Sequence, residues 1–243
     1  MGTTGEHVPE HESQAHAMRT LAANIWVLEG ETVPFHGFPY TTRMTCVRLA
    51  DGSLWIYSPV RLTPHVHSQI SLLGPVRYLV APNHLHHLFI GDWQQAFPEA
   101  QLYGTTQVIA KRKDLTFDAV LDGQRHWPWS KEMDQVVFSG SRLMEEAVFF
   151  HRPSETLIVA DLIENFPQGH FNWWQRPIAR LAGILAPHGK TPLDWRLSFN
   201  RRLAQDSLTH IKAWAPKWIV MAHGEIVEEK DNNFLNDSFD WLE

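Results

Sequence analysis

Short apolar runs with the two-residue alternation of β-strands dominate the first quarter of the chain. They occupy residues 24–30, 42–50 and 53–59. Asp51-Gly52, between the second and third runs, is a strong signal for a tight hairpin turn. The pattern therefore predicts antiparallel strands at the start of the domain.

A helical pattern over residues 62–74 interrupts the strands. Thr63 can cap the N-terminus of this helix, Pro64 suits its first position, and Gly74 ends the pattern. The apolar run PVRYLVAPN follows and is typical of a buried strand. Strand, helix, strand is the opening of a layered α/β fold.

The rest of the chain continues this alternation. Short helices are expected around FIGDWQQAFP and TTQVIAKRKD, with the strand AQLYGT between them. Further strands are predicted at 134–140, 145–152 and 155–161, and longer helices at about 171–186 and 196–214. The strand KWIVMAHG and a helix ending FDWLE complete the pattern. With no internal repeat and no linker, residues 22–243 form one predicted α/β domain, preceded by a flexible tail over residues 1–21.

Composition narrows the class of protein. Apolar residues at 44% and charged residues at 20% are ordinary for a globular domain, and a net charge of −6 argues against a nucleic-acid surface. The single cysteine, Cys46, excludes an internal disulfide framework. Neither a secretory signal nor an apolar run of about 18 residues is visible. We therefore expect a cytoplasmic protein with a small-molecule substrate and no nucleic-acid or membrane partner, and a homo-oligomer stays open.

Histidine is unusually frequent, at 15 of 243 residues, and three histidines gather directly after the buried strand. In an extended backbone, His84 and His86 point to the same side, which suits one metal ion. His87 then points elsewhere, toward the interior or a helix N-terminus. The place itself favours chemistry, because active groups in α/β folds collect at the carboxyl ends of strands.

Two more predicted strands end in residues that could bind a metal. TLIVAD ends at Asp161, and KWIVMAHG ends at His223. Two or three histidines with one carboxylate are an ordinary ligand set for zinc. If the strand ends converge, His84, His86, Asp161 and His223 form one metal site. The alternative is that Asp161 and His223 are ordinary strand-end caps.

The segments PNHLHHLFIGDW, FFHRPSETLIVADL and AHGEIV resemble the metallo-β-lactamase fold superfamily, and within it a family with a PNxxHHLF signature. The resemblance covers the chain from about residue 22 to 243. It implies a four-layer αββα sandwich with the site at one edge of its two sheets. It also implies that Asp161 corresponds to the bridging aspartate of the superfamily and His223 to its C-terminal histidine.

The chain departs from the His-x-His-x-Asp-His motif of that superfamily. Leu88 and Phe89 stand where the motif has Asp and the last His, and the stretch VVFSGSRLMEE lacks the expected third histidine of the first metal site. The surviving ligands would therefore hold one zinc ion at most. The missing Asp also removes the usual base, for which His87 and His151 are the nearest replacements in the sequence.

Two functions follow from this reading. The first is a mononuclear metal-dependent hydrolase of a small ester, thioester, lactone or phosphoester. The second is a metal-free, degenerate member that binds a ligand or a partner protein without turnover. A serine hydrolase is disfavoured because the sequence has no Gly-x-Ser-x-Gly elbow.

Overall fold

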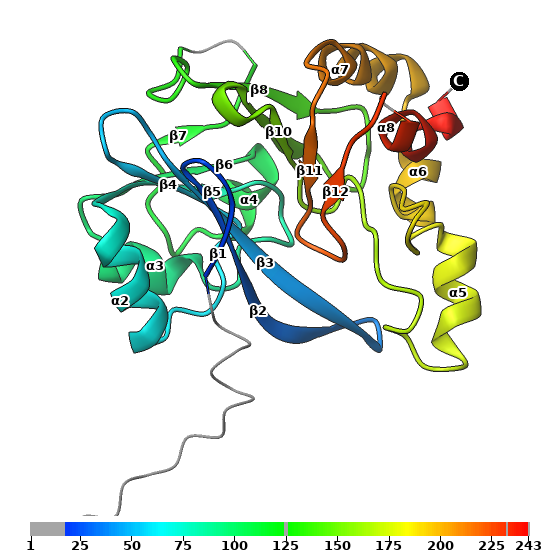
Figure 1. Cartoon of the computed structure of the whole chain (residues 1–243), viewed down its shortest axis with the longest axis horizontal. Coiled ribbons are helices and arrows are strands. Elements are labelled where there is room, and N and C mark those ends of the chain that lie inside the picture. The colour runs from blue at the N-terminus through cyan, green and yellow to red at the C-terminus, as the bar shows by residue number, and fades with distance from the viewer. Residues whose placement is uncertain (1–17, 124–125, 232, 243) are drawn as a thin grey trace, which may run out of the picture.

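Two β-sheets form the centre of the protein (Figure 1), which we describe from a computed structural model over residues 18–123, 126–231 and 233–242. The first sheet has the order β1 (Arg19–Ala22), β2 (Ile25–Phe35), β3 (Phe38–Arg48), β4 (Leu54–Tyr57), β5 (Val76–Ala81), β6 (Gln101–Gly104) and β7 (Ala119–Val120). The second has the order β12 (Val227–Glu228), β11 (Trp218–Val220), β10 (Thr156–Ile158), β9 (Glu146–His151) and β8 (Met133–Phe138).

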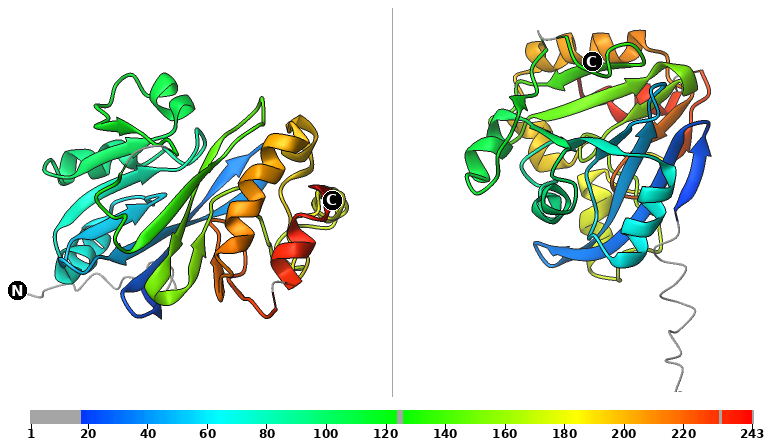
Figure 2. Two further views of the ribbon diagram at one scale, coloured as in Figure 1. Left: turned by 90° about the horizontal axis from the view of Figure 1, so that it is seen from above. Right: turned by 90° about the vertical axis from the view of Figure 1, so that its left-hand side faces the viewer.

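Helices cover the outer faces of both sheets (Figure 2). The first sheet packs against α2 (Pro64–Leu73), α3 (Ile90–Ala96) and α4 (Thr106–Lys111). The second sheet packs against α6 (Leu193–Ser198), α7 (Arg201–Ala213) and α8 (Asn233–Ser238). The chain also forms α5 (Gln175–Ala182) and two short 3₁₀ turns, η1 (Arg152–Ser154) and η2 (Asp240–Leu242). A third apolar cluster, with Trp55 and Phe149 at its centre, fills the space between the sheets. The fold is therefore the predicted αββα sandwich.

The local signals at the start of the domain are confirmed. The side chain of Thr63 accepts a hydrogen bond from the backbone N–H of Val66, so it caps α2, and α2 ends before Gly74. Strands β3 and β4 pair as an antiparallel hairpin around Asp51-Gly52, where Gly52 has a φ of 83°. The cap and the turn both depend on residues that are neighbours in the sequence, which is why the sequence predicted them.

Other boundaries differ from the prediction. Residues 19–21, which were assigned to the flexible tail, belong to strand β1, and Met18 before them packs against the apolar core. Residues 1–17 of that tail lie outside the described residues. The predicted helix 196–214 is two helices, because the Asn200 side chain caps a new helix at α7. The predicted helix 171–186 is the shorter α5.

The long β2–β3 hairpin is the largest difference. Strands β2 and β3 pair as far as Phe35 and Phe38, well beyond the predicted strand ends. His36 and Gly37 form the tip with φ values of 47° and 81°, as a two-residue hairpin turn requires. This hairpin extends toward α5 (Figure 1) and forms one wall of the cavity described below.

No helix in the described ranges has the length and apolar character needed to cross a membrane.

Candidate metal centre

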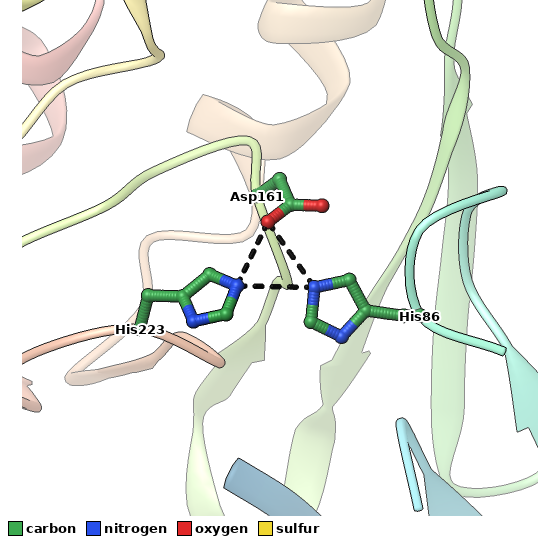
Figure 3. A group of neighbouring side chains, drawn as sticks. All are labelled: His86, Asp161 and His223. Atoms are coloured by element: carbon green, nitrogen blue, oxygen red, sulfur yellow. Dashed lines mark hydrogen bonds and ion pairs between the residues drawn. The ribbon is translucent and has the colours of Figure 1, made fainter. Parts of the chain in front are cut away.

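Three strand ends meet at one edge of the sandwich. The loop after β5 carries His86, the loop after β10 carries Asp161, and the loop after β11 carries His223 (Figure 3). Strands β10 and β11 are parallel, so their carboxyl ends emerge together. This convergence joins residues that are 75 and 137 positions apart from His86 in the sequence.

The three side chains point their ligand atoms at one another. Asp161 Oδ1 lies 3.1 Å from His86 Nε2 and 3.0 Å from His223 Nε2, and the two nitrogens are 3.2 Å apart. Asp161 and His223 are buried, and the His86 side chain is 8% exposed. Among the described residues, these are the one group of three His, Cys, Asp or Glu side chains with ligand atoms close enough for a shared metal.

The protonation pattern favours a cation at the centre of this triangle. Nδ1 of His223 faces the backbone carbonyl oxygen of Thr41, which can only accept, so Nδ1 carries the ring proton. Burial lowers the pKa of His223 in spite of the neighbouring carboxylate, which favours the neutral ring with a lone pair on Nε2. Asp161 Oδ1 and His223 Nε2 are then two acceptors in contact. A proton on His86 Nε2 can bridge to only one of them, whereas a metal ion satisfies all three atoms.

The charge state of Asp161 also suits a metal ligand. Burial on its own would raise the pKa of Asp161, but the charge of a protonated His86 and the hydrogen bond that this ring donates hold the pKa of Asp161 far below its usual range. Burial likewise opposes protonation of His86, but the charge of Asp161 outweighs it and raises the pKa of His86. Zinc takes two imidazole nitrogens and a carboxylate oxygen at about 2.0–2.2 Å, which needs only a slight opening of this triangle. The residues present fit one such ion.

Two residues that the sequence analysis missed hold Asp161 in place. Asn83 Nδ2 donates to Asp161 Oδ2 at 2.8 Å and to Glu146 Oε2 at 2.9 Å. The buried Glu146 carboxylate accepts in addition the backbone N–H groups of Ala160, Asp161 and Leu162 at 2.8–3.1 Å. The only sequence signal for Glu146 was a carboxylate opening a run of apolar residues at the start of β9.

Residues on the side away from the triangle hold His86 and His223 in their orientations. Ser58 Oγ lies 2.6 Å from His86 Nδ1, which fixes the ring with Nε2 toward the centre. The buried Arg43 guanidinium donates to the carbonyl oxygens of Met221 and Gly224 at 2.6 and 2.7 Å and so clamps the loop that carries His223. These contacts fix the positions of both imidazole rings before any ion binds.

The structure does not bring His84, which was expected to be a fourth ligand, to the triangle. Its Nδ1 lies 3.0 Å from Gln107 Oε1, away from the triangle. The cause is the backbone after Asn83, whose side-chain oxygen accepts from the N–H groups of Leu85 and His86 and so turns the chain. The two-residue alternation of side chains holds only for extended backbone, so the expected pairing of His84 with His86 is lost.

The two histidines expected to act as bases, His87 and His151, lie in different parts of the fold. His151 lies at the far end of β9 from Glu146, five residues or roughly 17 Å away along the strand, so the structure does not bring it to the triangle. His87 is buried and lines the cavity next to the triangle. However, Arg112 donates to its Nδ1, and burial together with Lys111 and Arg112 lowers the pKa of His87 to about 4. His87 is therefore a weak base.

A cavity of about 510 Å³ opens onto the triangle. Its walls come from the β2–β3 hairpin, the loop 85–89, and helices α5 and α6. Leu88, which stands where the superfamily motif has its Asp, lines this cavity and is 56% exposed. The size is typical of small-molecule sites.

The sequence itself settles the family. Residues 23–183, about two thirds of the chain, match the family described as Domain of unknown function (DUF4336). The chain belongs to this family. A search of the curated proteins finds no match.

Solved structures show the fold of this family member. The chain is similar to a metallo-β-lactamase from Pontibacter korlensis, with a TM-score of 0.64 and 10% identity over 93% of this chain and 98% of that one. It is similar to the metallo-β-lactamase FIM-1 from Pseudomonas aeruginosa in its mono-zinc form, with a TM-score of 0.63 and 10% identity over 93% and 94%. A metal-soaked Flv1 flavodiiron core from Synechocystis matches with a TM-score of 0.63 and 12% identity over 93% of this chain and 60% of that one. The protein therefore has a metallo-β-lactamase-like fold.

Proposed function

We propose that the protein is a mononuclear metal-dependent hydrolase that cleaves a small ester, thioester, lactone or phosphoester. The observation that carries the proposal is the buried triangle of His86, Asp161 and His223 at the floor of a ligand-sized cavity. Three protein ligands that leave one open position are the usual arrangement of a catalytic zinc site. The mono-zinc form of FIM-1, which shares the fold, supports a single ion as well.

A bound zinc ion lowers the pKa of a water molecule toward neutrality and polarises a carbonyl or phosphoryl oxygen. Hydrolysis then joins the water oxygen to the acyl carbon or phosphorus and breaks the bond to the leaving oxygen or sulfur. One water proton has to reach that leaving atom, so the protein needs a group that accepts and returns a proton.

We assign this proton transfer to Glu164. Its carboxylate is buried, lines the cavity and accepts a hydrogen bond from the Tyr40 hydroxyl at 3.1 Å. Tyr40 packs edge-on against the His223 ring, with 5.0 Å between the ring centres. Burial, followed by the negative charge of Asp161, raises the pKa of Glu164 well above its usual value. A carboxyl group whose pKa is raised in this way holds a proton more readily than an ordinary glutamate and can return it to a leaving atom.

Metal content tests the proposal most directly. The protein should be purified without a histidine tag and analysed by elemental mass spectrometry. After chelation, it should be titrated with zinc in a calorimeter, where we expect one equivalent to bind. His86→Ala should abolish this binding, whereas His84→Ala is the matched control and should retain it, because His84 contacts Gln107 instead.

Turnover tests the second half of the proposal. Glu164→Gln should lower kcat for p-nitrophenyl esters at least 100-fold and leave zinc affinity unchanged. Asp194→Asn, an exposed carboxylate at the same cavity, is the control and should keep activity. If no metal binds, or if His84→Ala removes it as completely as His86→Ala, the hydrolase proposal fails and the ligand-binding reading replaces it. Leu88 and Phe89 stand where the superfamily has ligands of its second metal ion, and this loss supports the alternative of a metal-free ligand-binding protein.

A further inference from the structure

We infer that the cavity binds a neutral carboxylic ester whose acyl part is an extended apolar chain, with the ester group at His86, Asp161 and His223. This inference narrows the proposed function and rests on it for the identity of the reacting group. It concerns what the walls of the cavity accept, which the triangle alone does not determine.

The walls away from the triangle are mostly apolar. On one side the β2–β3 hairpin contributes Val33, Phe35 and Phe38, and on the other side α5 contributes Ile178 and Ala182. The buried side chains of Ile184 and Trp195 also line the cavity. Such walls bind a hydrocarbon chain by removing its surface from water, and they offer few hydrogen bonds to a polar chain.

The charges at the cavity disfavour a strongly anionic ligand. Asp161, Glu164 and Asp194 all line it. Lys111 is the single Lys or Arg among the described lining residues, and its ammonium group donates to the carbonyl oxygen of His84 at 2.9 Å. A phosphate monoester would meet three carboxyl groups and no arginine fork, which is the usual partner of phosphate. Of the hydrolysable groups considered, an uncharged carboxylic ester fits this balance best.

The apolar walls are held together before any ligand enters. Gln175 Nε2 at the start of α5 donates to the Gly37 carbonyl oxygen at the hairpin tip, with a distance of 2.8 Å. His170 Nε2 lies 2.7 Å from the carbonyl oxygen of Pro39, and Phe38 packs edge-on against Trp174. Hairpin and helix therefore need little further ordering on binding, so burial of the chain converts into affinity.

Methyl ketones test the inference without turnover, because they present a carbonyl group and an alkyl chain that cannot be hydrolysed. The purified protein should be titrated calorimetrically with 2-butanone and 2-octanone. Each buried methylene contributes about 0.8 kcal/mol, or about a fourfold gain in affinity. Four added methylenes should therefore strengthen binding on the order of 100-fold.

Two surface variants on α5 give a matched comparison. Ile178 lines the cavity and is 50% exposed, whereas Leu181 is 73% exposed and does not line it. Ile178→Arg should weaken 2-octanone binding at least tenfold, and Leu181→Arg should leave it unchanged. Ala182→Phe should reduce affinity for 2-octanone more than for 2-butanone, because it fills the space for the chain. Far-UV circular dichroism checks that all three variants are folded.

The result separates this inference from the proposed function. Affinity that rises with chain length and is lost in Ile178→Arg supports the inference, whether or not the protein hydrolyses p-nitrophenyl butyrate. Affinity that is flat with chain length, or equally reduced by Leu181→Arg, overturns it even if the zinc-loaded protein hydrolyses p-nitrophenyl acetate.

Discussion

Replacing Glu146 by alanine should destabilise the protein more than most single substitutions. The Glu146 carboxylate is fully buried and accepts four hydrogen bonds, three from consecutive backbone N–H groups at residues 160–162 and one from the Asn83 side chain. Alanine leaves all four donors without their partner. The backbone that presents Asp161 to the two histidines would lose its anchor at the same time.

The magnitude follows from those contacts. Each buried donor that loses its acceptor costs about 1–3 kcal/mol. Two effects favour the lower end of that range. Water can enter the space left by the side chain. Burial, followed by the charge of Asp161, also raises the pKa of Glu146 to about 7, so the substitution removes some electrostatic repulsion. We expect a loss of about 3–5 kcal/mol in the free energy of unfolding.

Urea unfolding followed by tryptophan fluorescence measures this loss. Glu145→Ala is the matched control, because the neighbouring half-buried carboxylate accepts a hydrogen bond from the Gln107 backbone N–H at 3.2 Å and does not hold the 160–162 backbone. That variant should lose about 1 kcal/mol or less. A difference between the two variants below 1 kcal/mol would refute the anchoring role assigned to Glu146.

Three further predictions follow from other contacts. Ser58→Ala removes the hydroxyl at His86 Nδ1 and should weaken zinc binding 10- to 100-fold in a calorimetric titration, without abolishing it. Burial, followed by the charge of Arg152, lowers the pKa of His151 to about 4, so the unfolded chain binds a proton there between about pH 6.5 and 4 that the folded protein does not. Stability should therefore fall as the pH falls through this window, by up to ~3 kcal/mol, and urea midpoints of His151→Asn should fall less. Asn200→Ala removes the side-chain cap of α7 and should cost about 1 kcal/mol in the same unfolding assay, whereas an unchanged midpoint would contradict the cap.

The sequence by itself determined the layered fold and the places where chemistry could occur. Apolar strands and capped helices are set by short-range preferences, and the cap at Thr63 and the turn at Asp51-Gly52 appear where the local residues require them. The ends of the apolar strands identified His86, Asp161 and His223, because a strand that leaves a buried sheet exposes its next polar side chains at the sheet edge.

Tertiary structure decided which of those side chains face one another. His84 and His86 share a side only if the backbone stays extended, and the side chain of Asn83 turns it instead. His151 is close to Asp161 in the sequence, but the antiparallel pairing of β9 with β10 carries it to the opposite end of the sheet.

The residues that hold the three side chains of the triangle in place could not be predicted from the sequence either. Glu146, Ser58 and Arg43 act through backbone groups and ring nitrogens that lie 14 to 181 positions away. No local pattern encodes such contacts, because they exist only once the two sheets have packed and the loops at their shared edge have met. The residue types that can bind a metal are thus readable from the chain, whereas the direction in which each one points is a property of the packed fold.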